Sequence, residues 1–179
     1  MNITPKPGHS RLLISLIVGA AILVTVLVFL SRAFGESDVR DAKPAPSFVV
    51  RDLQGHAVKL ANFKDKALLV CFLATWDKNC QEQITILNDL LKGYGETNLA
   101  VLGLALDQTS AETVKAYAEK QHLDYPLYLA DYDVIMAFGG LTKIPTMFVI
   151  DKHQNIIQTH IGVTETNILG VEVTAILKQ

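Results

Sequence analysis

Eight consecutive apolar residues, Ala67 to Ala74, constrain this chain more than any other feature. An uninterrupted apolar run of this length is typical of a β-strand that is covered on both faces, as central strands of parallel sheets are. The run ends at Thr75-Trp76-Asp77-Lys78-Asn79-Cys80, and apolar residues then recur at helical spacing to about Lys92. The sequence therefore predicts a buried strand, a turn and a helix, which together begin an α/β domain.

The remaining segments continue this alternation and complete a single domain. A capping-box pattern, Thr109-Ser110-Ala111-Glu112, marks the start of the second helix. We expect a βαβα unit with parallel strands, followed by two further strands and a last helix. The other predicted elements are a hairpin at the domain edge (48–51 and 57–60), strands at 99–106, 127–129, 146–150 and 156–161, and helices ending near His122 and spanning 133–138 and 165–177.

An uncharged stretch of 19 residues, Leu12 to Leu30, lies between Arg11 and Arg32. At about 1.5 Å per residue a helix of this length crosses the hydrocarbon core of a bilayer. A cleaved signal peptide is the alternative, with Ser31-Arg32-Ala33 as the cleavage site, but its apolar region is usually only about 7–15 residues long. We therefore predict a retained transmembrane helix or signal anchor.

These features divide the chain into four parts. We expect a tail at 1–11, a membrane span at 12–30, a linker at 31–46 with Pro44 and Pro46, and a globular domain at 47–179. A short tail before a span and a large domain after it is the layout of a signal anchor, so we place the domain outside the cytoplasm, on the periplasmic side of an inner or plasma membrane. The formal net charge of −2 gives no electrostatic case for nucleic-acid binding.

Three motifs occur in a fixed order along the predicted domain. They are Pro44-Ala45-Pro46-Ser47-Phe48, then Ala74-Thr75-Trp76, then Ile144-Pro145-Thr146-Met147-Phe148-Val149-Ile150-Asp151. In this order and spacing the chain resembles the membrane-anchored TlpA/ResA-like branch of the thioredoxin superfamily, a redoxin group related to AhpC/TSA proteins. The resemblance covers residues 44–179 and implies a thioredoxin-like fold with an N-terminal β-hairpin extension, preceded by one transmembrane helix.

The resemblance also implies a thiol-disulfide site, in which a cysteine pair separated by two residues opens a helix. The outer cysteine attacks as a thiolate and the inner one resolves the mixed disulfide. In this chain the outer position is Asp77 and only the inner position, Cys80, is a sulfur. Asp77 is either a helix cap or a carboxylate that handles protons or ligands. As an anion, Asp77 disfavours formation of the Cys80 thiolate. The catalytic pair is degenerate, because one of its two cysteines is absent.

Cys71 adds a second sulfur on the predicted buried strand. The resemblance places it behind the inner cysteine, where thioredoxins have a buried carboxylate. One hypothesis is a disulfide between Cys71 and Cys80, which an extracytoplasmic location permits. The other interpretation is that Cys71 is a small apolar core residue.

The same resemblance predicts a cis peptide bond between Ile144 and Pro145, in a loop that offers backbone groups to an extended partner chain. Trp76 either lines that surface or packs in the core. Ile144, Pro145 and Trp76 are therefore the candidate residues for binding a polypeptide.

Two function classes remain for the chain. The first is a thiol-disulfide oxidoreductase that works through Cys80 on a thiol-containing partner protein, and the second is a non-catalytic module that binds an extended polypeptide or supports an envelope complex. A peroxiredoxin fits poorly, because its Pro-x-x-x-Thr-x-x-Cys pattern is replaced by Leu73 and Asp77 before Cys80. We expect no cofactor and no metal. Asp107 is placed for a local turn, and Glu82 for the exposed face of a helix. The spacing of the histidines is not that of a metal site; they are His56, His122, His153 and His160.

Overall fold

The computed structural model describes residues 24–25, 43–52, 56–94 and 98–178. The chain divides into two compact units, Met1–Arg40 and Asp41–Gln179, and the second unit is the α/β domain. Apart from Val24 and Thr25, the membrane span predicted at 12–30 lies outside the described residues. Within the described ranges no helix has the length and apolar character needed to cross a bilayer.

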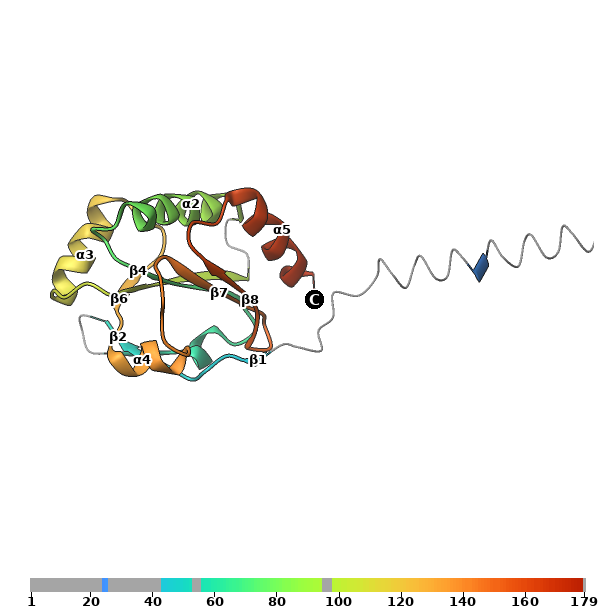
Figure 1. Ribbon diagram of the computed structural model, residues 1–179, viewed down its shortest axis with the longest axis horizontal. Helices are drawn as coiled ribbons and strands as arrows, with labels where there is room; N and C mark the ends of the chain where they lie inside the picture. Colours follow the sequence, from blue (N-terminus) through green and yellow to red (C-terminus); the bar gives the residue numbers. More distant parts are fainter. Residues whose placement is uncertain (1–23, 26–42, 53–55, 95–97, 179) are drawn as a thin grey trace, which may run out of the picture. The chain divides into compact units, whose positions relative to one another are not determined.

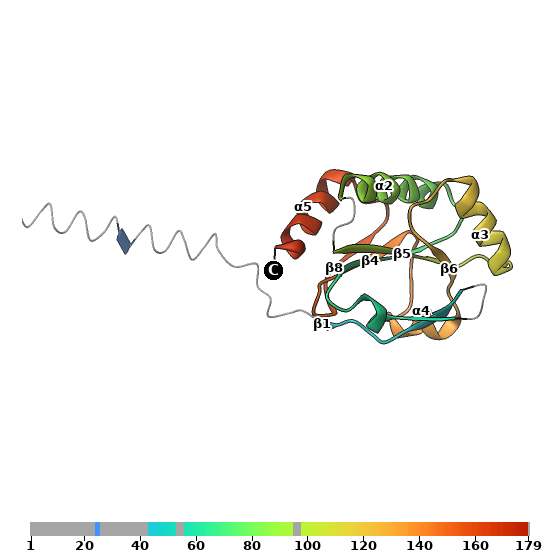
Figure 2. The same cartoon turned by 180° about the vertical axis from the view of Figure 1, so that it is seen from behind.

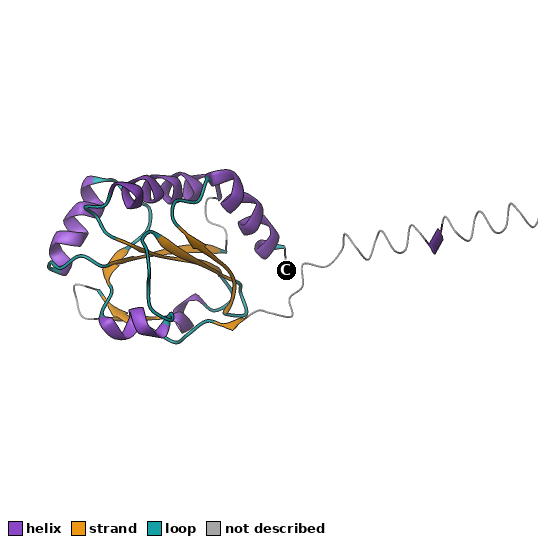
Figure 3. Ribbon diagram, viewed as in Figure 1, coloured by secondary structure: helices purple, strands orange, loops and turns teal. Residues whose placement is uncertain are grey.

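The elements of the domain follow the predicted order. They are β1 (Lys43–Pro44), β2 (Val49–Arg51), β3 (Ala57–Lys59), η2 (Leu60–Phe63), β4 (Ala67–Leu73), α2 (Lys78–Tyr94), β5 (Leu99–Ala105), α3 (Ala111–Lys120), β6 (Leu127–Leu129), α4 (Tyr132–Ala137), β7 (Thr146–Ile150), β8 (Asn155–Ile161) and α5 (Thr166–Leu177). Figure 3 shows these helices lying on both sides of the strands.

In the described part of the chain the main sheet has six strands, in the order β1-β8-β7-β4-β5-β6 (Figure 1). β4 runs parallel to β5, and β5 runs parallel to β6. β7 lies on the other side of β4 and is antiparallel to it and to β8. The parallel unit predicted from the sequence therefore meets at β4 the two later strands, which pair antiparallel.

All seven residues of β4 are buried, as the apolar run predicts. Helices α2, α3 and α5 cover one face of the sheet, and α4 covers the other together with β2 (Figures 1 and 2). Leu69, Cys71 and Leu73 belong to the core under α2 and α5, whereas Phe72 belongs to the core on the opposite face. Phe72 packs edge-on against two further phenylalanine rings there, with centroids 5.2 and 6.0 Å away.

The predicted hairpin is present: β2 and β3 form a separate two-stranded sheet whose Val50 joins the core on the face that α4 covers. Two local features differ from the sequence-based expectations. β1, inside the predicted linker, pairs with β8, because Lys43 lies opposite Ile156. The cap of α3 is Ser110 and not Thr109: its hydroxyl oxygen accepts the backbone N–H of Thr113 at 3.3 Å.

Candidate functional site

The candidate site lies at one edge of the main sheet, where several chain segments meet. β4 and β5 are parallel and end together, because Leu73 pairs with Ala105. β7 runs the other way and begins at the same edge, where Thr146 pairs with Phe72. The turn before α2 and the loop that ends at Pro145 are therefore neighbours in space.

Asp77 caps α2. Its side-chain Oδ1 accepts the backbone N–H of Cys80 at 2.9 Å, and its carbonyl oxygen accepts the N–H of Gln81 at 3.0 Å, which begins the helix. The hydrogen bond from the Cys80 backbone holds the pKa of Asp77 below its ordinary value. A carboxylate in this position is anionic at neutral pH and satisfies a helix N–H that otherwise lacks a partner.

Cys80 follows one turn into the helix and points into the core. Its side chain is 0% exposed and belongs to the same apolar cluster as Cys71. Burial raises the pKa of Cys80 to about 12, the anions of Asp77 and Asp107 add to this rise, and a backbone contact with Ala74 opposes it. At pH 7 the Cys80 side chain is therefore almost entirely the neutral thiol, which is a poor nucleophile.

Cys71 lies on β4 between Gly103 of β5 and Met147 of β7. Its side chain is fully buried, and burial raises its pKa, with a smaller contribution from Cys80. Both cysteines are free thiols in the structure, so the disulfide hypothesised between them is not formed in it. Cys71 here fills the core as a small apolar side chain.

Asp107 belongs to the site, although the sequence suggested only a local turn. Its Oδ2 accepts the backbone N–H of Thr75 at 3.0 Å, and its Oδ1 accepts the Thr75 hydroxyl. The Gln81 side-chain amide donates to the Thr75 carbonyl oxygen at 2.9 Å. These bonds fix the turn that carries Trp76 and Asp77. The parallel strands that end before Thr75 and Asp107 were the sequence signal for this contact.

The loop before β7 provides the second wall of the site. The peptide bond between Ile144 and Pro145 is cis, which confirms the prediction from the resemblance. The Pro145 carbonyl oxygen accepts the N–H of Gly162 at 2.8 Å, and the Thr146 hydroxyl donates to the Lys143 carbonyl oxygen at 2.6 Å. In the described ranges no hydrogen bond involves the backbone N–H or C=O of Ile144. Both groups therefore lack a hydrogen-bond partner within the described part of the domain.

Two further contacts fix the turn before α2 and the loop before β7 in their positions. Ile144 is half-buried and packs against the apolar cluster that contains Cys80. Gln83, one turn after Cys80, is completely buried; its Oε1 accepts the Thr164 N–H at 2.7 Å, and its Nε2 donates to the Thr164 carbonyl at 3.4 Å. Helix α2 is thereby joined to the segment after β8, whose Gly162 supports Pro145. No pattern in the sequence indicated this connection.

The family follows from a match of residues 42–159 to the model of the AhpC/TSA family. The chain belongs to the AhpC/TSA family. Its similarity to curated relatives includes "Thiol-disulfide oxidoreductase ResA" of Bacillus cereus, at 32% identity over 145 residues, covering 75% of this chain and 83% of the relative. "Thioredoxin-like protein YneN" of Bacillus subtilis is 32% identical over 131 residues, covering 71% and 75%.

Solved structures place this AhpC/TSA protein among thioredoxin-like folds. A thioredoxin-family thiol:disulfide interchange protein from Chlorobium tepidum superposes with a TM-score of 0.68 at 31% identity, covering 76% of this chain and 97% of the other. The α/β thioredoxin-like fold and the relationship to ResA-like oxidoreductases predicted from the sequence are therefore confirmed.

Trp76 is 71% exposed and lies on the surface, so it is not a packed core residue. The histidines lie apart: His160 Nε2 contacts Glu172 Oε2 at 2.8 Å, whereas His56 Nδ1 contacts Asp52 Oδ2 at 2.9 Å. Among the described residues, no three His, Cys, Asp or Glu side chains are grouped as ligands for one metal ion.

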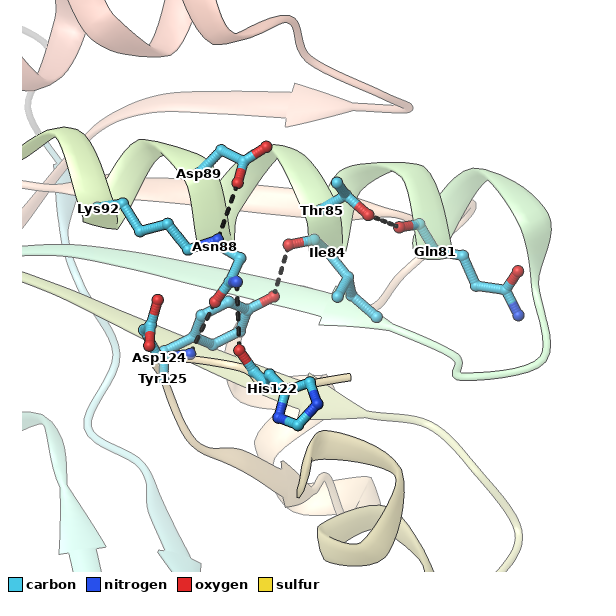
Figure 4. Close-up of polar contacts among 9 residues, drawn as sticks. All are labelled: Gln81, Ile84, Thr85, Asn88, Asp89, Lys92, His122, Asp124 and Tyr125. Carbon is cyan, nitrogen blue, oxygen red and sulfur yellow. Dashed lines mark hydrogen bonds and ion pairs between the residues drawn. The ribbon is translucent and has the colours of Figure 1, made fainter. Parts of the chain in front are cut away.

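A polar groove of about 380 Å³ between α2 and α3 is a feature that the sequence did not indicate. Figure 4 shows polar contacts along it. Asn88 donates to the His122 carbonyl at 3.3 Å and accepts the Asp124 N–H at 2.7 Å, and the Tyr125 hydroxyl donates to the Ile84 carbonyl at 3.3 Å. These bonds attach α2 to the segment before β6, so the polar side chains at this groove stabilise the fold beside the site.

Proposed function

We propose that this AhpC/TSA protein is a membrane-tethered, extracytoplasmic thioredoxin-like module that binds an extended polypeptide at the loop of Ile144 and Pro145. Dithiol exchange is not its activity. The proposal rests on a contrast within the site: the Cys80 thiol is a poor nucleophile, whereas the groups suited to binding a polypeptide at Ile144 are present.

The muted half of the contrast is chemical. The position of the attacking thiol is an aspartate that serves as a helix cap, and the remaining sulfur of Cys80 is 0% exposed with a raised pKa. Thiol-disulfide exchange begins with a thiolate that reaches a partner's sulfur, and neither condition is met at Cys80.

The intact half of the contrast is geometric. Ile144 offers a backbone N–H and C=O without partners among the described residues, next to its half-buried apolar side chain. Free main-chain groups beside an apolar surface are what a protein uses to bind a chain in extended conformation. Trp76 adds a large exposed ring at the same edge of the sheet.

A second candidate function is monothiol exchange through Cys80. The backbone at Ala74 lowers the pKa of the Cys80 thiol, although burial and the neighbouring carboxylates outweigh it. In this mechanism the Cys80 thiolate attacks a partner disulfide, releases one partner thiolate, and an external thiol then resolves the mixed disulfide.

The docking function is tested with reduced, carboxymethylated α-lactalbumin, an extended polypeptide that has no free thiol. We expect the full chain in detergent to bind it, and Ile144→Asp to weaken binding about 10- to 100-fold, because a charge replaces an apolar contact. Val171→Asp, at a position 72% exposed on α5, is the matched control and should bind as the wild type does. Equal binding by wild type and Ile144→Asp would reject this docking loop.

The tether is tested separately from docking. Residues 12–30 have the length and composition of a bilayer-spanning helix. We expect the full chain to remain in the membrane pellet after an alkaline carbonate wash, and a chain without residues 1–30 to be released. Protease added to intact spheroplasts should digest the domain if it lies outside the cytoplasm. Protection of the domain, or release of the full chain by the wash, would contradict this part of the proposal.

A further inference from the structure

The turn before α2 presents an anion and an exposed aromatic ring side by side. We propose that the polypeptide bound at this site carries a lysine or arginine whose side chain is received by Asp77 and Trp76. This inference rests on the proposed docking function and names the class of polypeptide that it selects. The cation of the polypeptide contacts Asp77, which occupies the position of the attacking cysteine of a dithiol enzyme.

The two receiving side chains are held on a rigid turn. Thr75, directly before them, is bound by the Asp107 carboxylate through its N–H and hydroxyl and by Gln81 through its carbonyl. The carboxylate of Asp77 is itself fixed by the N–H of Cys80 at 2.9 Å. A preorganised anion loses little conformational entropy when a cation binds, which favours a specific contact.

The position of the turn brings it level with the docking loop. Thr146 pairs with Phe72, so Ile144, two residues before Thr146, is level with the turn that follows β4. Ile144 also packs against the core on the face of the sheet that α2 covers, and Asp77 caps this helix. A chain that hydrogen-bonds to the Ile144 backbone therefore has Trp76 and Asp77 beside it.

The charges around the site favour a basic residue at this one position. Two carboxylates border the turn: Asp107 accepts the Thr75 N–H, and Asp77 accepts the N–H of Cys80. Two cations lie near: Lys78 is exposed, and the Lys143 ammonium is next to Gly162, about 4.0 Å from where a Cβ there would lie. An acidic residue of the polypeptide is repelled by Asp77, and the cations that attract it are Lys143, on the Pro145 side, and the exposed Lys78.

Trp76 contributes in a way that an anion alone does not. Its ring is 71% exposed. Indole faces attract ammonium and guanidinium groups through the ring quadrupole, and guanidinium also stacks on them. We therefore expect arginine to be bound at least as well as lysine.

The probes are four fluorescein-labelled decapeptide pools, with Arg, Lys, Gln or Glu fixed at the fifth position and random uncharged residues other than Cys and Pro elsewhere. Binding to the full chain in detergent is measured by fluorescence anisotropy at low ionic strength. The Arg and Lys pools should bind about tenfold more tightly than the Gln pool, and the Glu pool more weakly than the Gln pool. Added salt should reduce the advantage, because the ion pair is partly exposed.

Asp77→Asn removes the charge but keeps a side chain that caps helices as well as aspartate does. We expect it to reduce the advantage of the Arg pool below about twofold, by loss of the charged partner. Asp131→Asn is the matched control, because Asp131 caps α4 through the same 2.9 Å bond to a backbone N–H, that of Val134. Trp76→Leu should reduce the Arg advantage without a change of charge.

The outcomes separate this inference from the function on which it rests. Pools that bind equally well, with binding lost in Ile144→Asp, would overturn the basic preference and leave the docking function standing. The basic preference alone is likewise overturned if carboxymethylated α-lactalbumin binds and no pool does, or if Asp77→Asn retains the Arg advantage. Failure of both the pools and α-lactalbumin to bind would overturn the docking function itself.

Discussion

Asp77→Cys is expected to raise the rate of insulin reduction by about two to three orders of magnitude over the wild-type protein. An exposed thiol at a helix start has a pKa of about 7, whereas Cys80 is held at about 12. At pH 7 this difference changes the thiolate fraction by about 10⁵-fold, and the lower nucleophilicity of the more acidic thiol reduces the gain by about 10²-fold or slightly more. The variant also has an outer attacking thiol, and Cys80 is placed to resolve the mixed disulfide.

Three comparisons make this result informative. Asp77→Ser removes the anion and keeps a capping hydroxyl, and it should remain close to the wild-type rate because no second sulfur is gained. The double substitution Asp77→Cys with Cys80→Ala should lose turnover for lack of a resolving thiol. If the wild type already reduces insulin within tenfold of Asp77→Cys, the muted-thiol interpretation fails; if Cys80→Ala then abolishes that activity, monothiol exchange is the function.

Gln83→Leu is expected to lower the free energy of unfolding by about 2–4 kcal/mol. The wild-type amide makes two hydrogen bonds with Thr164 in a fully buried position, and leucine replaces neither of them. Loss of the longer bond, from Gln83 Nε2 to the Thr164 carbonyl oxygen, costs about 1 kcal/mol, and the buried Thr164 N–H left without a partner costs about 1–3 kcal/mol. Urea denaturation of residues 41–179 measures the change from the transition midpoint.

The control for this prediction is Gln158→Leu on β8. Gln158 is exposed and has no side-chain hydrogen bond in the described residues, so its replacement should change stability by less than about 0.5 kcal/mol. A Gln83→Leu variant as stable as this control would show that the connection between α2 and Thr164 contributes little to the free energy of unfolding. Reduced α-lactalbumin binding by Gln83→Leu would further indicate that this connection positions Pro145.

The sequence predicted the elements of the domain well, because their signals are local. The apolar run of β4 and the helical spacing after Asp77 are both properties of short segments, and short segments determine whether a strand or a helix forms. A helix cap was one of the two roles considered for Asp77, and it too is a local signal, since its partner is only three residues away. The exposure of Trp76 was left open, because a single aromatic residue has no periodicity of its own.

The contacts that assemble the site were harder to predict, because their partners are distant in the chain. Asp107 and Thr75 are separated by 32 residues, and Gln83 and Thr164 by 81. Such pairs depend on strand order and register, which periodicity does not determine. The burial of Cys80 depends likewise on the strands and on α5, whose residues join the same core cluster.

The short strand β1 has a consequence for how the domain meets other molecules. Lys43 and Pro44 pair with Ile156 and Asn155, at the start of β8, whereas Ile161 at the other end of β8 lies opposite Thr146. Strand β1 thus lies at the end of the sheet remote from Trp76 and Asp77. If a polypeptide binds beside Trp76 and Asp77 as proposed, β1 does not compete with it for that end of the sheet.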